Sequence, residues 1–201
     1  MFPLVSFGYE DDQTHPALSS QIVDFYNKLH PKDSISKREK RWIMKGSKQE
    51  DRWPRWWNHF YDPVREISFN GNNLGSLSKK NVQNFSDVFI TPRDPLAATE
   101  WVTNRQAQSS YGRYGGDQTY GKALESLKNN KRRKAFLALG HVLHLLEDMG
   151  VPAHTRNDLH PPLGRQGKRW IGESGSPYEE FASRYTPQNI EKKTSNLEEL
   201  M

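Results

Sequence analysis

The sequence predicts an all-α fold in which helices are joined by long loops. Apolar residues recur at helical spacing in several segments, most clearly in residues 131–149. Glycine, asparagine and serine gather between these segments, notably in residues 66–87. The chain has 201 residues, which suits a single domain spanning 1–201, and only 34% are hydrophobic. The core must therefore be compact, with aromatic residues supplying much of it.

The first expected helix begins near Thr14, with Ser19 or Ser20 as a candidate cap. Its apolar stripe comprises Ile22, Val23, Phe25, Tyr26 and Leu29. The basic stretch 31–48 is interpreted as a short helix that packs Trp42, Ile43 and Met44 inward.

Three further helices are expected in the second half of the chain, at residues 95–108, 120–129 and 177–182, with a glycine-containing turn at 111–118. The helix at 177–182 starts with a proline in its first turn. The tail 187–201 is polar.

The chain is organised around residues 140–154, which hold the end of the expected central helix formed by residues 131–149. Their apolar residues cover most sides of the expected helix, which is typical of a helix in a core. Gly150 and Pro152 end it. His144 and Asp148 are four residues apart, so they share a helix face, and His141 lies on the same face. His154 follows the helix end, where a turn in the chain can return it to that face.

Two interpretations of this cluster remain open from the residues alone. One histidine can be a hydrogen-bonded core residue, with Asp148 serving as a cap or as the partner of Arg156. The other interpretation is a metal site, because imidazole and carboxylate groups are zinc ligands and a cation offsets the cost of burying a carboxylate. The chain has no cysteine, so any metal site must use His, Asp, Glu and backbone groups.

Residues 50–63 form a second informative segment, rich in tryptophan and other aromatic residues, with Asp51 and His59 among them. A packed aromatic loop in which Asp51 pairs with Arg52 or Arg55 is the alternative to a functional site. His15, at the first helix, is by itself expected at the surface.

The formal net charge of +5 modestly favours anionic partners, although an ordinary solvated surface explains it better. No run of apolar residues is long enough for a transmembrane helix. Residues 1–12 begin with a short apolar stretch that lacks a basic region. They are compatible with the remnant of a longer signal peptide but are not a signal peptide alone.

Four motifs together resemble the zinc-dependent phospholipase C family, whose fold is shared with fungal zinc-dependent single-strand nucleases. They are Thr14-His15, Asn58-His59-Phe60-Tyr61-Asp62-Pro63, His144-x3-Asp148-x5-His154 and Tyr178-Glu179-x-Phe181. The resemblance spans roughly residues 13–186. It implies a compact multi-helix bundle with long loops that holds up to three zinc ions.

The resemblance also implies a ligand set. Asp51, His59, His144 and Asp148 would hold one ion, and His15 would hold a second with Asp148 as the bridge. His154 and Glu179 would hold a third with another histidine, for which His160 is the nearest candidate. Asp51 and Asp148 would be the catalytic carboxylates. Clustered zinc ions would activate a water that attacks phosphorus, and the alcohol would leave.

The expected function is therefore zinc-dependent phosphodiester hydrolysis of the phospholipase C type on phospholipids, with peripheral contact to a membrane surface through the aromatic segment. Two alternatives remain: a single-strand nuclease of the same fold, and a catalytically impaired metal-binding module. The third is motivated by Gly175, which stands where the family has a histidine, and by the absence of the family's ligating N-terminal residue just before His15. The resemblance implies a secreted or periplasmic location.

Overall fold

The computed structural model describes residues 14–52, 54–66, 68 and 95–157. These residues form helices connected by turns and loops, and no β-strand occurs among them, so the expected all-α class is confirmed. Some expectations lie outside the described residues: the signal remnant 1–12, nearly all of the loop 66–87, the helix 177–182 and the tail 187–201.

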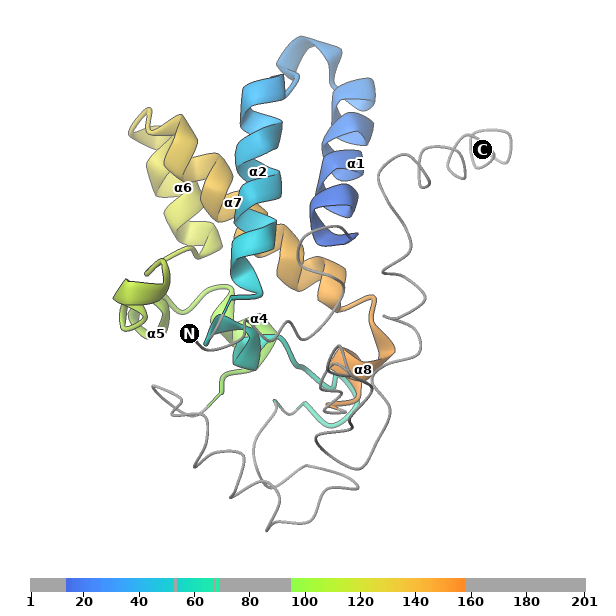
Figure 1. Ribbon diagram of the computed structural model, residues 1–201, viewed down its shortest axis with the longest axis vertical. Helices are drawn as coiled ribbons and strands as arrows, with labels where there is room; N and C mark the ends of the chain where they lie inside the picture. The colour runs from blue at the N-terminus through green and yellow to red at the C-terminus, as the bar shows by residue number, and fades with distance from the viewer. Residues whose placement is uncertain (1–13, 53, 67, 69–94, 158–201) are drawn as a thin grey trace, which may run out of the picture.

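Two helical hairpins make up the body of the described structure (Figure 1). The first joins α1 (Thr14–Leu29) through the 3-10 turn η1 (Pro31–Asp33) to α2 (Lys37–Glu50). The second joins α6 (Tyr120–Lys128) to α7 (Arg132–Asp148), as the sequence predicted for both segments. Helix α7 passes behind α2, with which it makes its most extensive contacts, and its carboxyl end lies near the start of α1.

Short elements complete the fold around the carboxyl ends of α2 and α7. They are η2 (Arg55–Asn58), α4 (Ala98–Trp101), α5 (Arg105–Ser109), η3 (Gly112–Tyr114) and α8 (Pro152–Thr155). The expectation of one helix over 95–108 is wrong, because Asn104 has a non-helical backbone and its side chain accepts a hydrogen bond from the amide of Ala107. An asparagine that caps in this way starts a new helix.

The N-terminus of α2 is fixed by a capping box between Ser36 and Glu39. The same Glu39 carboxylate accepts a hydrogen bond from Arg132 at the start of α7. This pair ties the beginnings of the two central helices together. The Ser-x-x-Glu spacing is a known helix-start signal, and the sequence analysis overlooked it.

The inward face of α1 differs from the expected apolar stripe. Val23 is buried, but the other four members are exposed by 37–58%: Ile22, Phe25, Tyr26 and Leu29. The face that α1 turns inward instead carries His15, Ser19 and Val23, each four residues from the next. Ser19 lies within the helix and bonds Glu147 of α7, so its expected role as a cap is wrong.

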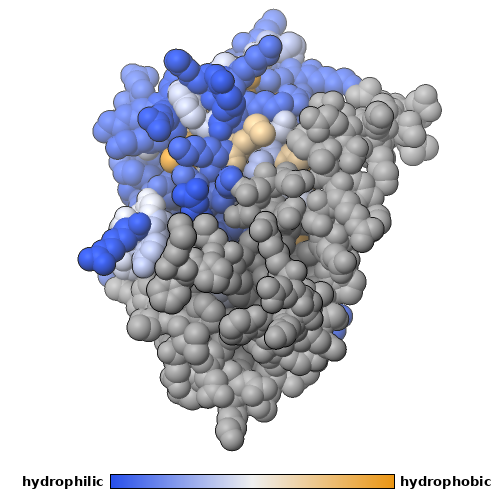
Figure 2. Space-filling model, viewed as in Figure 1, coloured by the Kyte–Doolittle hydropathy of each residue, from blue (hydrophilic) through white to orange (hydrophobic). Residues whose placement is uncertain are grey.

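The aromatic segment belongs to the interior. Trp56, Trp57 and Phe60 are all at most 5% exposed, and the two indole rings stack with centroids 4.3 Å apart. The described residues on the face seen in Figure 2 are mostly hydrophilic, with a few scattered hydrophobic ones. None of the helices among the described residues is long and apolar enough to cross a membrane. The segment therefore gives no support to a lipid-binding role for these three residues.

Two glycines set the close approach of α2 and α7. A Cβ atom at Gly140 would lie 2.0 Å from the carbonyl oxygen of Ile43, and one at Gly46 would lie 2.0 Å from that of Leu137. Backbone atoms cannot move aside as a flexible side chain can. Both helices carry ligands of the candidate site described below, so this contact sets the distance between them.

We expect Gly140→Ala to lower the free energy of unfolding by about 1–3 kcal/mol, because the added methyl group overpacks the α2–α7 contact. Gly121→Ala in α6 is the matched control: its Cβ would meet no atom closer than 3.8 Å, so its stability should stay equal or rise slightly. Urea unfolding of both variants checks this, and equal midpoints for the two would contradict it.

Candidate metal centre

Six buried side chains from five parts of the chain converge near the carboxyl end of α7. They are His15 of α1, Asp51 at the end of α2, His59 after η2, His144 and Asp148 of α7, and His154 of α8. Each is at most 2% exposed. The structure thus brings together every predicted ligand that lies within the described residues, whereas His160 and Glu179 lie outside them.

Four ligand atoms form a tight group: Asp51 Oδ1, His59 Nδ1, His144 Nε2 and Asp148 Oδ2. The two imidazole nitrogens are 3.3 Å apart. Asp148 Oδ2 lies 2.9 Å from His59 Nδ1 and 3.3 Å from His144 Nε2. Asp51 Oδ1 lies 3.7 Å and 3.5 Å from the same two nitrogens. Tetrahedral ligands at zinc bond lengths of about 2.1 Å are about 3.4 Å apart, so each of these five separations is compatible with two ligands of one cation. Two groups lie close enough to hold an ion, His59-His144-Asp148 and His15-Asp51-His144, and they share His144.

The hydrogen bonding of the carboxylates supports the same conclusion. Neither oxygen of Asp51 nor of Asp148 accepts a hydrogen bond from the described residues, although all four are buried. Leaving a buried carboxylate without such bonds costs several kcal/mol unless a cation compensates it. Groups of His and Asp close enough to hold a metal ion are therefore present. Zinc is among the metals that take imidazole and carboxylate ligands.

The ionisation of the cluster shows what replaces a cation when none is bound. Burial lowers the pKa of His144 and of His59, but the negative charge of Asp148 outweighs it and raises the pKa of both, that of His144 strongly. Burial raises the pKa of Asp148, but the surrounding histidines hold it well below its usual range. Asp148 and these two histidines thus stabilise each other's charged forms, and a metal bound to the histidine nitrogens would have to displace their protons.

His15 is buried, so the expectation of a surface residue is wrong. Its Nε2 lies 3.3 Å from Asp148 Oδ1, the oxygen that the four-atom group does not use. Its ring stacks on His144 with centroids 3.7 Å apart. Burial and His144 lower the pKa of His15, yet Asp148 and Glu147 raise it to about 9. Asp148 is therefore placed to bridge two ligand sets, as the resemblance implied.

His154 joins the cluster through a turn rather than through α7 itself. Helix α7 ends at Asp148, and Pro152 opens α8, which returns His154 to the same side. Its Nδ1 lies 3.2 Å from the carbonyl oxygen of His59 and 3.6 Å from Asp148 Oδ2, and its ring stacks on Phe60. The predicted third ligand set is thus represented by His154 alone within the described residues.

The neighbouring Glu50 has a different role from Asp51. Its carboxylate accepts hydrogen bonds from Arg55 Nε at 2.6 Å and from Trp101 Nε1 at 2.6 Å, and it pairs with His141 Nδ1. The alternative in which Asp51 pairs with Arg55 is therefore wrong, because Arg55 pairs with Glu50. Although burial raises the pKa of Glu50, Arg55 and His141 outweigh it and hold that pKa well below its usual range. Asp51 is therefore the acid of this pair that lies within a group able to hold a metal ion, and Glu50 is the centre of a buried hydrogen-bond network.

His141 is a hydrogen-bonded core residue in this network, one of the two roles that the sequence suggested for it. Burial lowers the pKa of His141 to about 4, so it is neutral at physiological pH. Glu50 had been the alternative to Asp51 as the early acid of the ligand set, whereas Glu147 was not predicted to contribute. A signal for Glu147 was present, because it directly precedes the predicted ligand Asp148 in the chain.

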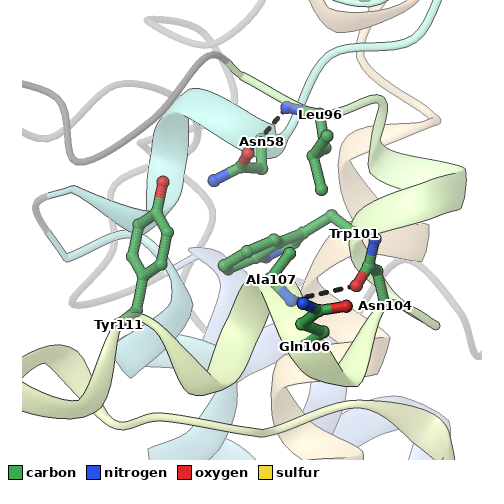
Figure 3. A pocket seen from close by; sticks show the side chains of 7 residues that line it. All are labelled: Asn58, Leu96, Trp101, Asn104, Gln106, Ala107 and Tyr111. Atoms are coloured by element: carbon green, nitrogen blue, oxygen red, sulfur yellow. Dashed lines mark hydrogen bonds between the residues drawn. The ribbon is translucent and has the colours of Figure 1, made fainter.

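A pocket of about 210 Å³ is lined by Asn58, Leu96, Trp101, Asn104, Gln106, Ala107 and Tyr111. Its lining residue Asn58 directly precedes His59 in the chain. Figure 3 shows that two of its polar side chains are hydrogen-bonded within the protein. Asn58 Oδ1 accepts a hydrogen bond from the amide of Leu96, and Asn104 Oδ1 accepts one from the amide of Ala107. Trp101 directs its N–H to Glu50. These groups serve the fold, and we assign no ligand to the pocket.

Comparisons with protein-family models, with curated proteins and with solved structures found no match for this chain.

Variants of the neighbouring acids Glu50 and Asp51 should have different effects, one mainly on the free energy of unfolding and the other mainly on metal affinity. Glu50→Gln should lower the free energy of unfolding of the metal-free protein by about 3–5 kcal/mol, because it leaves the buried Arg55 charge uncompensated. Asp51→Asn should cost less stability than Glu50→Gln, because Asp51 accepts no hydrogen bond from the described residues and lies 3.5 and 3.7 Å from its histidine partners, yet it should weaken zinc binding. Urea unfolding and zinc titration check both, and the reverse pattern would make Glu50 the ligand.

Zinc should raise the melting temperature of the metal-free protein, because an ion that binds only the folded state stabilises it by about 2.7 kcal/mol at 100 times its dissociation constant. Asp148→Asn should abolish most of this rise, since Asp148 contacts all four buried histidines of the cluster. Asp24→Asn removes an exposed carboxylate on α1 and should leave the rise unchanged. Scanning calorimetry with and without zinc decides between these outcomes.

Proposed function

We propose that this protein is a zinc-dependent phosphodiester hydrolase that cleaves phospholipids in the manner of a phospholipase C. The observation that carries the proposal is the convergence of Asp51, His59, His144 and Asp148 in two overlapping groups that could each hold a metal ion, with His15 directed at the second oxygen of Asp148. The motif resemblance supplies the reaction class, and the buried, cysteine-free donor set supports zinc as the metal.

The residues of the chain divide the work as follows. In the ligand set that the resemblance implies, Asp51, His59, His144 and Asp148 would hold the first ion, and His15 with Asp148 would contribute to a second beside it. His15 also lies close enough to Asp51 and His144 to share an ion with them. Zinc bound there would supply Lewis acidity toward phosphoryl oxygens and lower the pKa of a water. Asp51 has a second carboxylate oxygen that accepts no hydrogen bond from the described residues, and we assign it the uptake of a proton from the attacking water.

The chemistry is the breaking of one phosphorus–oxygen bond. The water oxygen bonds to phosphorus, the bond to the lipid alcohol breaks, and the alcohol leaves with a proton. A phospholipid is preferred as substrate because the motifs resemble the phospholipase branch more closely than the nuclease branch. Trp56 and Trp57 give no support to the nuclease alternative, because both indoles are buried in the core and offer no face on which a base could stack.

The zinc-loaded protein should release phosphocholine from phosphatidylcholine vesicles, and Asp148→Asn should reduce this rate at least about 100-fold, because it removes the carboxylate shared by the ligand sets. Asp24→Asn is the control and should retain the full rate. Phosphorus NMR of the released headgroup measures both.

The same preparation should be offered single-stranded DNA. Faster DNA cleavage than lipid cleavage, also lost in Asp148→Asn, would replace the lipid substrate with a nucleic acid and keep the metal chemistry. Zinc binding without turnover of either substrate or of a generic aryl phosphodiester would overturn the proposal in favour of a metal-binding module.

A further inference from the structure

Two Glu-Asp pairs, Glu50-Asp51 and Glu147-Asp148, lie at the ends of the helices that carry the cluster. In each pair the aspartate belongs to the candidate ligand group, and the glutamate does not. Each glutamate lies near one ring nitrogen of a histidine, His59 for Glu50 and His15 for Glu147. The other ring nitrogen of that histidine faces an aspartate. The same arrangement therefore occurs twice, on α2 and on α7.

The arrangement is clearest at Glu147. Its Oε2 lies 2.6 Å from His15 Nδ1, while His15 Nε2 lies 3.3 Å from Asp148 Oδ1. Adjacent residues of α7 thus engage opposite nitrogens of one ring. Ser19, one turn after His15 on α1, donates a hydrogen bond of 2.8 Å to Glu147 Oε1. Both carboxylate oxygens of Glu147 are therefore engaged by α1, and this fixes the carboxylate relative to the ring.

Glu50 repeats the pattern at longer range. His59 turns Nδ1 toward Asp148 Oδ2 at 2.9 Å and Nε2 toward Glu50 Oε1 at 3.7 Å. Glu50 also holds Arg55 and Trp101, so its removal would disturb the core. Glu147 has no comparable structural network among the described residues. The effect of a glutamate on its histidine can therefore be tested at the Glu147-Asp148 pair without disturbing the core.

We propose that Glu147 is a positioning residue for the metal centre, which keeps the proton of His15 on Nδ1 and thereby presents Nε2 to a cation shared with Asp148. The inference rests on the proposed metal centre and goes beyond it, because Glu147 has no place in the ligand set that the motif resemblance implies. A ligand histidine needs its metal-facing nitrogen unprotonated, and an acceptor at the other nitrogen fixes both the tautomer and the ring orientation.

The arrangement explains why two acids stand next to each other at the end of α7. Asp148 alone would leave the His15 ring free to present either nitrogen. Glu147 removes that choice, since a ring turned over would lose the 2.6 Å contact while Ser19 holds the carboxylate in place. The expected consequence is selective: the ion near His15 depends on Glu147, whereas the ion held by the four-atom group does not.

The test is titration of the full-length metal-free protein with zinc alone, in competition with a chromogenic chelator. Glu147→Ala should weaken one of the bound ions about 10–100-fold and leave the other unchanged. Glu147→Gln, which keeps an acceptor oxygen, should recover part of the loss, and Ser19→Ala should show a smaller loss of the same kind. Glu100→Gln, at an exposed site on α4, is the control for the removal of a charge.

A second readout is independent of affinity. In the zinc-loaded protein, long-range proton–nitrogen NMR should show the proton of His15 on Nδ1, and this signal should change in Glu147→Ala. A proton on Nε2, equal weakening of all ions, an unchanged titration, or a wild-type protein that binds fewer than two ions would each overturn the inference. Zinc binding with the predicted selectivity but no hydrolysis would uphold it and count against the proposed function alone.

Discussion

The requirement to neutralise two buried carboxylates governs this structure. Asp51 and Asp148 lie at the ends of the two central helices, and neither accepts a hydrogen bond from the described residues. An isolated charge in such a place is expensive, so something positive must accompany it. Histidines supply that charge when they are protonated, and a cation supplies it when they are not. The opposite pKa shifts of Asp148 and His144 express the same coupling from its two sides.

The fold meets this requirement by bringing the ends of helices together, so that side chains from different helices meet at one place. The glycine contact between α2 and α7 lets their backbones approach closely. The capping box of α2 and the Glu39–Arg132 pair fix the opposite ends of the same two helices. The end of α2 then presents Asp51 to the end of α7, and α8 returns His154 to both. The ligand set is in this sense a product of the helix packing rather than of any one element.

The sequence predicted helices α6 and α7 well, because apolar periodicity over many residues is a strong signal. It also predicted that His144 and Asp148 lie together on α7, since a spacing of four residues determines which side chains share a helix face. It failed where the outcome depended on distant partners. The apolar stripe of α1 looked like a core face, yet α1 turns His15 and Ser19 inward because Glu147 and Asp148 of α7 lie opposite them. The burial of His15 and the choice between Glu50 and Asp51 likewise depend on residues far away in the chain, which spacing cannot reveal.

Glu50 and Asp51 are adjacent in the chain but differ in role: Glu50 stabilises the core, and Asp51 faces the candidate centre. Glu50 has its carboxylate engaged by the core, so any change there alters the fold and the centre together. Asp51 has no such bonds, and its backbone position is already fixed by the end of α2. The described contacts of the Asp51 carboxylate are with histidines of the candidate centre, so this carboxylate is placed where it could hold a metal or accept a proton. Adjacent residues can therefore carry such different roles because the end of a helix directs one side chain into the core and the next toward the centre.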